Sequence, residues 1–430
     1  MCFDTMCTCN QTEIDRLATI INDIVVYERI HPAKDNETKV SKAQKIDQMI
    51  VDGVKAFQDA AYSTKQEAIY WYLWGNLYSC GPNYKQKSIE ALKRATAIDP
   101  DFINAWNELG ECYWNIMEVD LAKECFEKAL EKSVNKVSLR NLSAVTRNQC
   151  QTMKPNDKMD VLNTALCQAK KALNLDITDG YSWIALGNSY MSVFFNSPLQ
   201  RQYILQAIAC YSQAEKNLDT KTAATDVFFN KALAYKHLEN YSGALDYLLK
   251  CSECDWFWDL PSKTYDSLIQ YLEKIKDSIG HKGKMQTKRY NTMVKDLEIQ
   301  MRRYSGDSRY GIICIQDLKG GSNKDYILYG KILWIMEVLT TFPVTVGMVD
   351  AKGDEIVVSV FNSNPCLNFF KIGDNVIIPN PQYEVVDFLH KDIEYKFKKV
   401  RIDNPATLII NYKPLPEKFY AMYNFETSPN

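Results

Sequence analysis

The feature that most constrains this fold is a spacing of small and aromatic residues that recurs along the first two thirds of the chain. It is complete between Ile103 and Leu130, in the order Trp106, Leu109, Gly110, Tyr113, Ala122, Phe126 and Ala129. The spacing predicts two helices that cross closely at the small residues, with aromatic side chains filling the space between neighbouring pairs. Since one such pair cannot bury its apolar face alone, several pairs must stack.

Four further units carry the same pattern with shifted spacing. Their first helices include Trp71 and Gly75, Leu139 and Ser143, Trp183 and Gly187, and Phe228 and Ala232. Five such units in a row are typical of tetratricopeptide repeats (TPR), which stack into an all-α superhelix. We therefore predict N-terminal capping helices in residues 1–64 and a TPR array of about five helix pairs in residues 65–279.

From Tyr310 the apolar period becomes two, which indicates short β-strands. The residues Asp350 to Asp354 predict a hairpin turn, and Gly373-Asp374 predicts a corner before an apolar strand. Many short strands within about a hundred residues favour a small closed barrel, so we predict an all-β OB-fold domain over residues 309–412. A different small β-sandwich is the alternative, and residues 413–430 are assigned to a C-terminal tail.

The segment between the two predicted domains, residues 280–308, is basic. It includes Lys282, Lys284, Lys288 and Lys295, whereas the net charge of the whole chain is only −2. One interpretation is a solvated linker or helix face. The other is a contact to a phosphate backbone or an acidic partner.

No combination of residues in the sequence suggests catalysis. The chain has 13 cysteines and 4 histidines, and its only close cysteine pairs are Cys7-x-Cys9 and Cys251-x-x-Cys254. A structural zinc site needs four ligands, typically from two such pairs, so buried packing thiols are the better interpretation. The chain has none of the motifs GxSxG, HExxH or the P-loop. We expect no enzyme activity, no metal and no cofactor. The N-terminus lacks the pattern of a secretory signal and no long apolar run is present, so we expect reduced thiols, no membrane partner, and a cytoplasmic and nuclear protein.

In a TPR stack, the first helix of each pair lines a concave groove. Counting from each tryptophan-equivalent position predicts a polar groove that contains Asn107, Glu111, Arg140, Arg147, Asn188 and Asp226. Arg147 can bind a carboxylate bidentately and Asp226 can bind a cation, so a peptide with both charges would bind in one direction. A groove for the terminal carboxylate of a chaperone is not expected, because Ile184 and Phe229 stand where it needs basic or amide side chains.

Three blocks carry a resemblance that is more specific than the repeat pattern. They are Ala105 to Glu111, Asn135 to Ser143 and Asp179 to Tyr190. They closely resemble the tetratricopeptide repeat protein 5 (Strap) family, and the similarity covers nearly the whole chain, with the first 60 or so residues matching least. The family has a TPR array followed by an OB-fold domain, as predicted above from the residues.

The resemblance implies two functions. One is recognition of the N-terminal Met-Arg-Glu peptide of nascent tubulin at the ribosome, close to the exit tunnel and its RNA and proteins, followed by tubulin mRNA decay through a recruited adaptor and deadenylase complex. Arg147 and Asp226 match the family's groove residues, and Lys282, Lys284 and Lys288 fall in its ribosome-contacting segment. The alternative is a stress-responsive nuclear cofactor that scaffolds a histone acetyltransferase coactivator complex in the p53 response.

Under that alternative, the OB-fold domain would bind protein or single-stranded nucleic acid. Nucleic-acid faces of this kind combine exposed aromatic rings with basic residues. The one compact candidate is the run Tyr395, Lys396, Phe397, Lys398 and Lys399. Strand alternation favours burial of its two rings, so we expect no such face here.

Overall fold

The computed structural model describes residues 3–30, 39–58, 67–150, 153, 155–196, 200–218, 224–254, 258–282, 285–303, 309–336, 343–364 and 368–420. These residues form two compact units. The helical unit comprises the described residues up to Glu239 together with Asp246–Ser262. The β unit comprises Asn240–Leu245 and the described residues from Lys263 onward, so that the chain passes from one unit to the other within α12 and α13.

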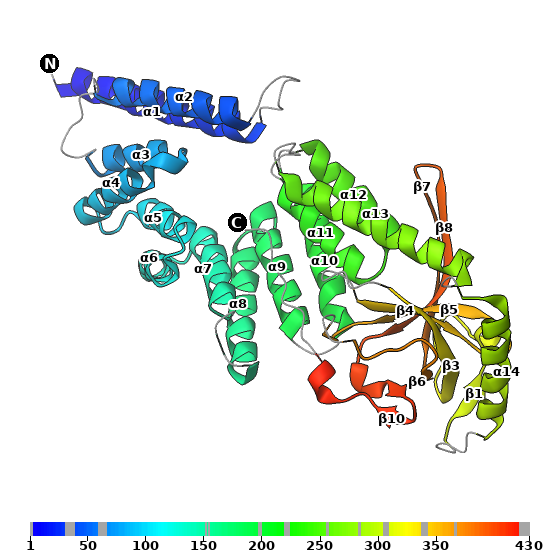
Figure 1. Cartoon of the computed structure of the whole chain (residues 1–430). Helices are drawn as coiled ribbons and strands as arrows, with labels where there is room; N and C mark the ends of the chain where they lie inside the picture. Colours follow the sequence, from blue (N-terminus) through cyan, green and yellow to red (C-terminus); the bar gives the residue numbers. More distant parts are fainter. Residues whose placement is uncertain are drawn as a thin grey trace. The chain divides into compact units, whose positions relative to one another are not determined.

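The helical unit begins with two long helices and continues as consecutive helix pairs (Figure 1). The long helices are α1 (Phe3–Ile30) and α2 (Lys39–Gln58). The pairs are α3 (Glu67–Ser79) with α4 (Lys85–Ile98), α5 (Ile103–Asn115) with α6 (Val119–Lys132), α7 (Lys136–Gln149) with α8 (Pro155–Leu175), α9 (Gly180–Asn196) with α10 (Arg201–Asn217), and α11 (Thr225–His237) with α12 (Tyr241–Cys254). The predicted five-pair TPR fold is confirmed.

Glycines explain why the two helices of a pair can approach so closely. A Cβ atom added at Gly75, Gly110 or Gly187 would lie 2.4 to 2.6 Å from a side chain of the partner helix. The opposing residues are Leu92, Phe126 and Tyr211, respectively, and all three are buried. The small residue in each first helix therefore accommodates the large residue in the second, as the repeat spacing predicts.

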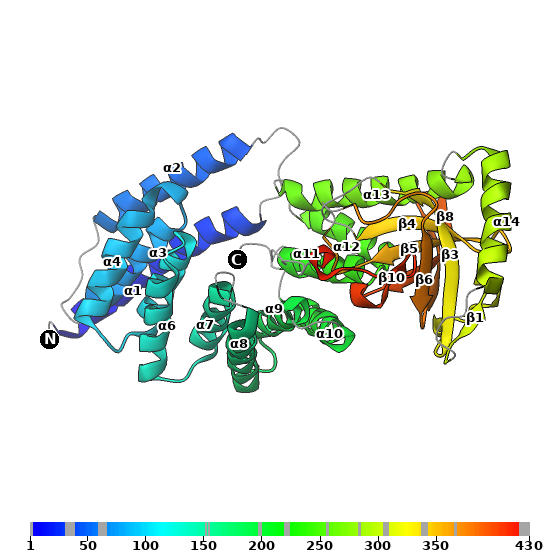
Figure 2. The same ribbon diagram turned by 60° about the horizontal axis from the view of Figure 1, so that its bottom comes forward.

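The β unit contains two helices and ten strands (Figure 2) among its described residues. The helices are α13 (Asp259–Gly280) and α14 (Thr287–Arg303). The strands are β1 (Gly311–Ile313), β2 (Gly321–Ser322), β3 (Tyr326–Ile335), β4 (Val344–Val349), β5 (Glu355–Val360), β6 (Asn375–Pro379), β7 (Gln382–His390), β8 (Ile393–Ile402), β9 (Ile409–Ile410) and β10 (Lys413–Pro414).

Strand pairing gives the OB-fold topology. Strands β3, β4 and β5 form an antiparallel meander, β5 then pairs in parallel with β8, and β8 forms a hairpin with β7. The barrel closes because β6 pairs with β3, and only Asn380 and Pro381 separate β6 from β7. An apolar core that includes Leu328, Met348, Val358 and Val400 fills the interior. The predicted OB-fold domain is confirmed, and the β-sandwich alternative is wrong.

The predicted turn between β4 and β5 is built around Asp350. Its carboxylate accepts hydrogen bonds from the backbone N–H groups of Lys352, Asp354 and Ile315 at 2.9 to 3.0 Å. Farther along, residues 413–420 contain β10 and a short 3-10 turn, and Leu415 is buried in the barrel core. The described β structure thus continues into the segment that the sequence assigns to a tail.

Candidate functional site

Among the described residues of the helical unit, one arginine has shielded nitrogen atoms without a hydrogen-bond partner. Arg147 lies in the last turn of α7, and its Nε and Nη1 atoms are shielded from solvent without a hydrogen-bond partner among the described residues. Burial lowers the pKa of the guanidinium to about 10, against the opposing influence of Tyr211 and Cys150. The group is still a cation at neutral pH, and its shielded N–H groups can bind an acceptor that the described chain does not supply.

A short hydrogen-bond chain, which does not include Arg147 itself, begins at the neighbouring Tyr211 and joins the next two repeats. The hydroxyl of Tyr211, whose pKa is raised by burial and lowered in part by Arg147, donates to Asn188 Oδ1 at 2.8 Å. Asn230 donates to the same oxygen through Nδ2 at 3.1 Å. Asn230 is fully buried, and its own Oδ1 has no partner in the described part of the chain. Residues of α7, α9, α10 and α11 therefore meet in one polar cluster.

Asp226 lies in the first turn of α11, four residues before Asn230. Residues four apart share one face of a helix, so Asp226 extends the polar cluster by one turn. Its side chain is half-buried. Of the six predicted groove residues, Asn188 thus bonds Tyr211, which lies close to Arg147, while Asp226 lies one helical turn from Asn230.

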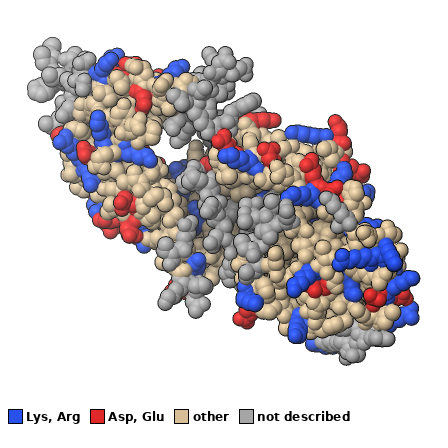
Figure 3. Space-filling view, viewed as in Figure 1, with Lys and Arg blue, Asp and Glu red and all other residues tan. Residues whose placement is uncertain are grey.

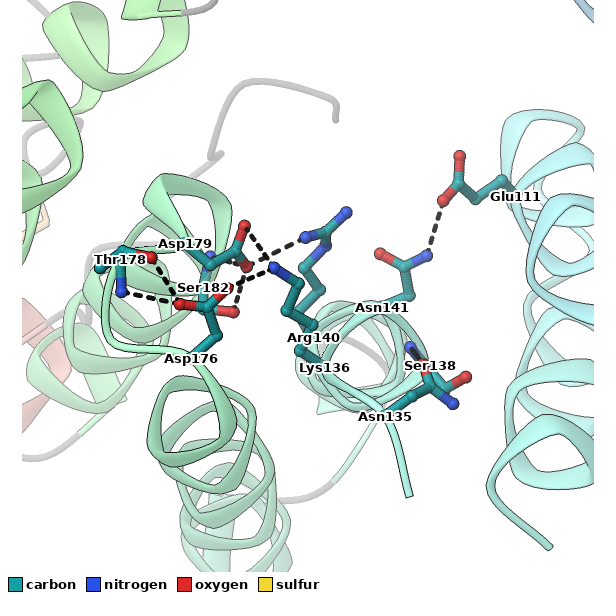
Figure 4. Close-up of polar contacts among 10 residues, drawn as sticks. All are labelled: Glu111, Asn135, Lys136, Ser138, Arg140, Asn141, Asp176, Thr178, Asp179 and Ser182. Atoms are coloured by element: carbon teal, nitrogen blue, oxygen red, sulfur yellow. Dashed lines mark hydrogen bonds and ion pairs between the residues drawn. The ribbon is translucent and has the colours of Figure 1, made fainter. Parts of the chain in front are cut away.

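The other three predicted groove residues already have partners within the repeats, and Figure 4 shows two of them, Arg140 and Glu111. Arg140 donates to Asp179 at 3.1 Å, and Glu111 accepts from Asn141 at 2.7 Å. Asn107 is buried and accepts from the Ser138 hydroxyl at 2.6 Å. These contacts join α5, α7 and α9, so each of the three side chains has a structural role between repeats.

Two acids between α8 and α9 organise the cluster of Figure 4. Asp179 directly precedes α9 and caps it by accepting from the Ser182 N–H at 3.1 Å. Asp176 accepts from Lys136 at 2.6 Å, and this bond together with those from Thr178 lowers the pKa of Asp176 to about 2. The sequence analysis assigned no role to these acids, because their partners lie about 40 residues earlier in the chain.

Tyr211 is a member of the polar cluster for which the sequence offered an unused signal. The position that faces the first-helix glycine is Leu92, Phe126 and Tyr211 in three repeats, and only the third side chain has a hydroxyl. A polar atom at a packing position that is otherwise apolar indicates a specific hydrogen bond. Here that hydroxyl holds Asn188.

The basic segment lies in the β unit. Lys282 is exposed, has a backbone φ of 47°, and places its Nζ atom 4.1 Å from the centroid of the Tyr290 ring. Lys288 is exposed in the first turn of α14. Lys284 lies outside the described residues. The ribosome-contacting role of all three remains a prediction.

The aromatic run of β8 does not form an exposed stacking platform. Tyr395 and Phe397 are buried, as strand alternation predicts, and so is Lys399. Within the described residues, no cluster of three potential metal ligands occurs, and no helix is long and apolar enough to cross a membrane.

Comparisons with known proteins agree with this architecture. Residues 309–423 match the model of the tetratricopeptide repeat protein 5 OB fold domain, and residues 103–131 and 225–255 match the tetratricopeptide repeat model. A thermophilic TPR protein of Thermus thermophilus is similar in structure, with a TM-score of 0.41 and 17% identity over 47% of this chain and 99% of that one.

Two full-length relatives extend the similarity across both units. Tetratricopeptide repeat protein 5 of Bos taurus is 32% identical over 383 residues, which cover 87% of each protein. Its Homo sapiens counterpart is 30% identical over 414 residues, which cover 94% of this chain and 93% of the human one. Both the repeats and the barrel domain are shared at this level, and this chain therefore belongs to the tetratricopeptide repeat protein 5 family.

Proposed function

We propose that this chain is a TPR adaptor that recognises the N-terminal Met-Arg-Glu peptide of nascent tubulin at the ribosome and promotes decay of the tubulin mRNA. The repeats and the family membership support an adaptor. The choice of ligand rests on the shielded guanidinium of Arg147. Its Nε and Nη1 atoms have no partner among the described residues.

A carboxylate is the ligand group that best fits Arg147. Its two oxygens match the geometry of a guanidinium, and such charge-assisted bonds are about twice as strong as neutral ones. In a partly desolvated site the gain is larger, because the arginine has already lost much of its water. The glutamate at the third position of the tubulin peptide offers this carboxylate.

The opposite charge lies on α11. Asp226 is one helical turn from Asn230, which connects through Asn188 and Tyr211 to the region of Arg147. An arginine that directly precedes the glutamate in the peptide would face Asp226. The two charges fix the direction of the peptide, since a reversed chain would place like charges together.

Binding of labelled peptides to the full chain tests this proposal. We expect a Met-Arg-Glu peptide to bind, and Arg147→Ala to weaken it roughly 30-fold or more, because a buried charged pair typically contributes at least about 2 kcal/mol. The Met-Arg-Gln peptide should bind weakly to the natural chain, and Arg147→Ala should reduce its affinity little further. This non-additivity identifies Arg147 as the partner of the glutamate.

Lys171→Ala is the matched control, because it removes one exposed cation from the neighbouring helix α8. It should bind the peptide as the natural chain does. In a lysate, Arg147→Ala should no longer enrich ribosomes that translate tubulin. If Arg147→Ala lowered the affinities of the Met-Arg-Glu and Met-Arg-Gln peptides by the same factor, Arg147 would not recognise the glutamate.

A further inference from the structure

One edge of the barrel sheet is open along most of strand β7. On one side β7 pairs with β8 over its whole length, from Gln382 to His390. On the other side it pairs only with the short strand β2, which reaches as far as Tyr383. From Glu384 to His390 no described strand lies on that side, and the stretch contains no proline or lysine, the residues that usually protect a free edge. Figure 1 shows this part of the β7–β8 hairpin as an arm that extends beyond the neighbouring strands.

The alternation of hydrogen bonds decides which backbone groups of β7 point away from β8. His390 and Ile393 flank a two-residue turn with positive φ at both positions, as in a type I′ turn. Residues that flank such a turn exchange both backbone hydrogen bonds, so every second residue back from His390 bonds β8. At the other end of β7, the Asn323 N–H donates to the Pro381 carbonyl at 3.1 Å. Both ends therefore indicate that the odd-numbered residues of β7 face the open edge.

Val385, Asp387 and Leu389 thus present their N–H and C=O groups at the open edge. None of these groups has a hydrogen-bond partner among the described residues. The three side chains share one face of the hairpin, where Val385 is 52% and Leu389 66% exposed. Between them, the Asp387 carboxylate accepts from Lys396 Nζ of β8 at 2.5 Å. The open edge therefore combines unsatisfied backbone groups with two apolar side chains and one carboxylate.

Helix α13 holds the hairpin from the opposite face. His390 follows Leu389 in the strand, so its side chain points to the other side of the sheet. There the hydroxyl of Tyr265 hydrogen-bonds His390 Nε2 at 2.9 Å, and Lys276 Nζ donates to the Glu394 carbonyl at 3.1 Å. A partner at the open edge meets a strand that is already extended and fixed, so binding orders little of this chain.

We infer that the open edge of β7, from Val385 to Leu389, binds an extended segment of a partner protein as an added antiparallel strand. An added strand satisfies the free backbone groups, and its side chains lie directly opposite those of β7. Apolar residues suit Val385 and Leu389, and a lysine or arginine between them suits Asp387. The segment therefore has a basic residue with an apolar residue two positions away on each side. This inference goes beyond the proposed recognition of nascent tubulin, which concerns the helical unit.

A second copy of this chain fits the edge less well. If two β7 strands pair with Val385 opposite Leu389, the two Asp387 carboxylates lie directly opposite each other, which is destabilising. A shift by two residues places each carboxylate opposite an apolar side chain instead. Overall charge does not select a partner either, since acidic and basic side chains both lie on the visible face of the β unit (Figure 3). Selection therefore rests on Asp387 and its two apolar neighbours.

Titration of the full chain against fluorescent peptides, followed by anisotropy, tests this inference. The probe is the capped peptide Thr-Val-Thr-Arg-Thr-Val-Thr, which has the expected pattern and alternates as a β-strand does. N-methylation of both valines, whose N–H groups would face β7, should weaken binding at least roughly 10-fold. N-methylation of the two threonines beside the arginine, whose N–H groups would face away, should change the affinity by no more than about threefold.

Variants of the chain test the same edge. Val385→Pro puts a ring in place of an edge N–H and keeps the bonds to β8, so it should weaken probe binding at least roughly fivefold. The matched variant Val385→Thr keeps the N–H group and should bind within about threefold of the natural chain. Asp387→Lys should reverse the preference for the arginine probe over a version with glutamate at its centre, and this measurement does not depend on the folding of the proline variant.

Absence of probe binding by the natural chain, equal binding after either N-methylation, or an unchanged preference in Asp387→Lys would overturn the inference. A concentration-dependent dimer of the natural chain that Val385→Pro abolishes would overturn it in favour of a second copy. All three variants should bind the Met-Arg-Glu peptide as the natural chain does, so a failure here is distinguishable from a failure of the groove proposal.

Discussion

Arg140 and Arg147 lie seven residues apart on the same helix, α7, and nearly on the same face, yet their surroundings differ completely. Arg140 bonds Asp179, and its guanidinium carbon lies 5.1 Å from the centroid of the Tyr181 ring. Arg147 has two shielded nitrogen atoms with no partner among the described residues. Two turns of one helix therefore separate an arginine that joins two repeats from one whose shielded nitrogen atoms have no partner among the described residues.

The difference shows that polar residues of a repeat array can either stabilise the fold or reduce its stability. A cation whose hydrogen bonds are complete contributes to stability, whereas a desolvated cation without a partner costs stability until something binds it. A local loss of stability of this kind is common at binding sites. Three substitutions on this network test whether the two arginines differ in this way, and Asp179 offers the largest expected effect.

Asp179→Ala should cause the largest loss of stability. Its carboxylate caps α9, accepts from the Ser182 hydroxyl at 2.5 Å and receives Arg140, while its side chain is only 9% exposed. Removing it leaves Arg140 without its acid and α9 without its cap, so we expect a loss of about 2–3 kcal/mol. Denaturant unfolding followed by circular dichroism measures this.

The same experiment distinguishes the two arginines. Arg140→Ala in the Asp179→Ala background should add little, because the pair is already broken. Arg147→Ala in that background should act independently. A large further loss with Arg140→Ala would mean that Arg140 stabilises the repeats through other contacts.

The sequence predicted the elements well but could not separate the two arginines. Helix pairs follow from local spacing, since Gly75, Gly110 and Gly187 each meet a large side chain of the adjacent helix. Arg140 and Arg147 both satisfy the groove offsets. Which of them is paired depends on Asp179, 39 residues beyond Arg140, and hence on how one repeat stacks on the next. A single repeat carries no information about that placement.

Prediction from the sequence was limited in the same way for the β unit. Alternation along β8 predicted that Tyr395 and Phe397 are buried, which is correct. It did not indicate that the outer face of β4 would also be buried, because the residue that reaches Thr345 is Tyr271 of α13, 74 positions earlier. Local patterns define strands and their faces, but long-range packing decides which faces solvent can reach.

Arg147→Met should have a smaller effect on stability and one of opposite sign. Methionine fills a similar volume without a charge, so the desolvation cost of the guanidinium disappears. We expect the helical unit to become more stable by about 1 kcal/mol, while the Met-Arg-Glu peptide no longer binds. Denaturation midpoints and peptide titrations of the same preparation measure both changes.

One further variant and one peptide addition test the origin of this gain in stability. Arg140→Met should destabilise the unit, because it leaves the carboxylate of Asp179 with one partner fewer. Adding saturating Met-Arg-Glu peptide should make the natural chain more stable than Arg147→Met, since a ligand that binds only the folded state stabilises it. If Arg147→Met is less stable than the natural chain without peptide, the guanidinium has a structural role similar to that of Arg140.

The smallest effect concerns the partly exposed pair of Lys136 and Asp176, which lies beside Arg140. The hydrogen bond from Lys136, and those from Thr178, lower the pKa of Asp176 to about 2 in the folded chain, compared with about 3.9 in an unfolded one. Because the folded pKa is the lower of the two, the pair stabilises the fold above about pH 4. This contribution disappears as the pH falls from about 4 to 2.

Asp176→Asn keeps an acceptor for the Thr178 N–H group but has no charge to titrate. The natural chain should therefore be slightly more stable than Asp176→Asn at about pH 6, and the difference should vanish near about pH 2. High salt should reduce this difference in stability further, because solvent reaches both partners in part. A difference that persists at the acidic end would show that the hydrogen-bond geometry of Asp176 stabilises this junction, and not its charge. In that case the contrast between the two ends of α7 would rest on Asp179 and Arg147 alone.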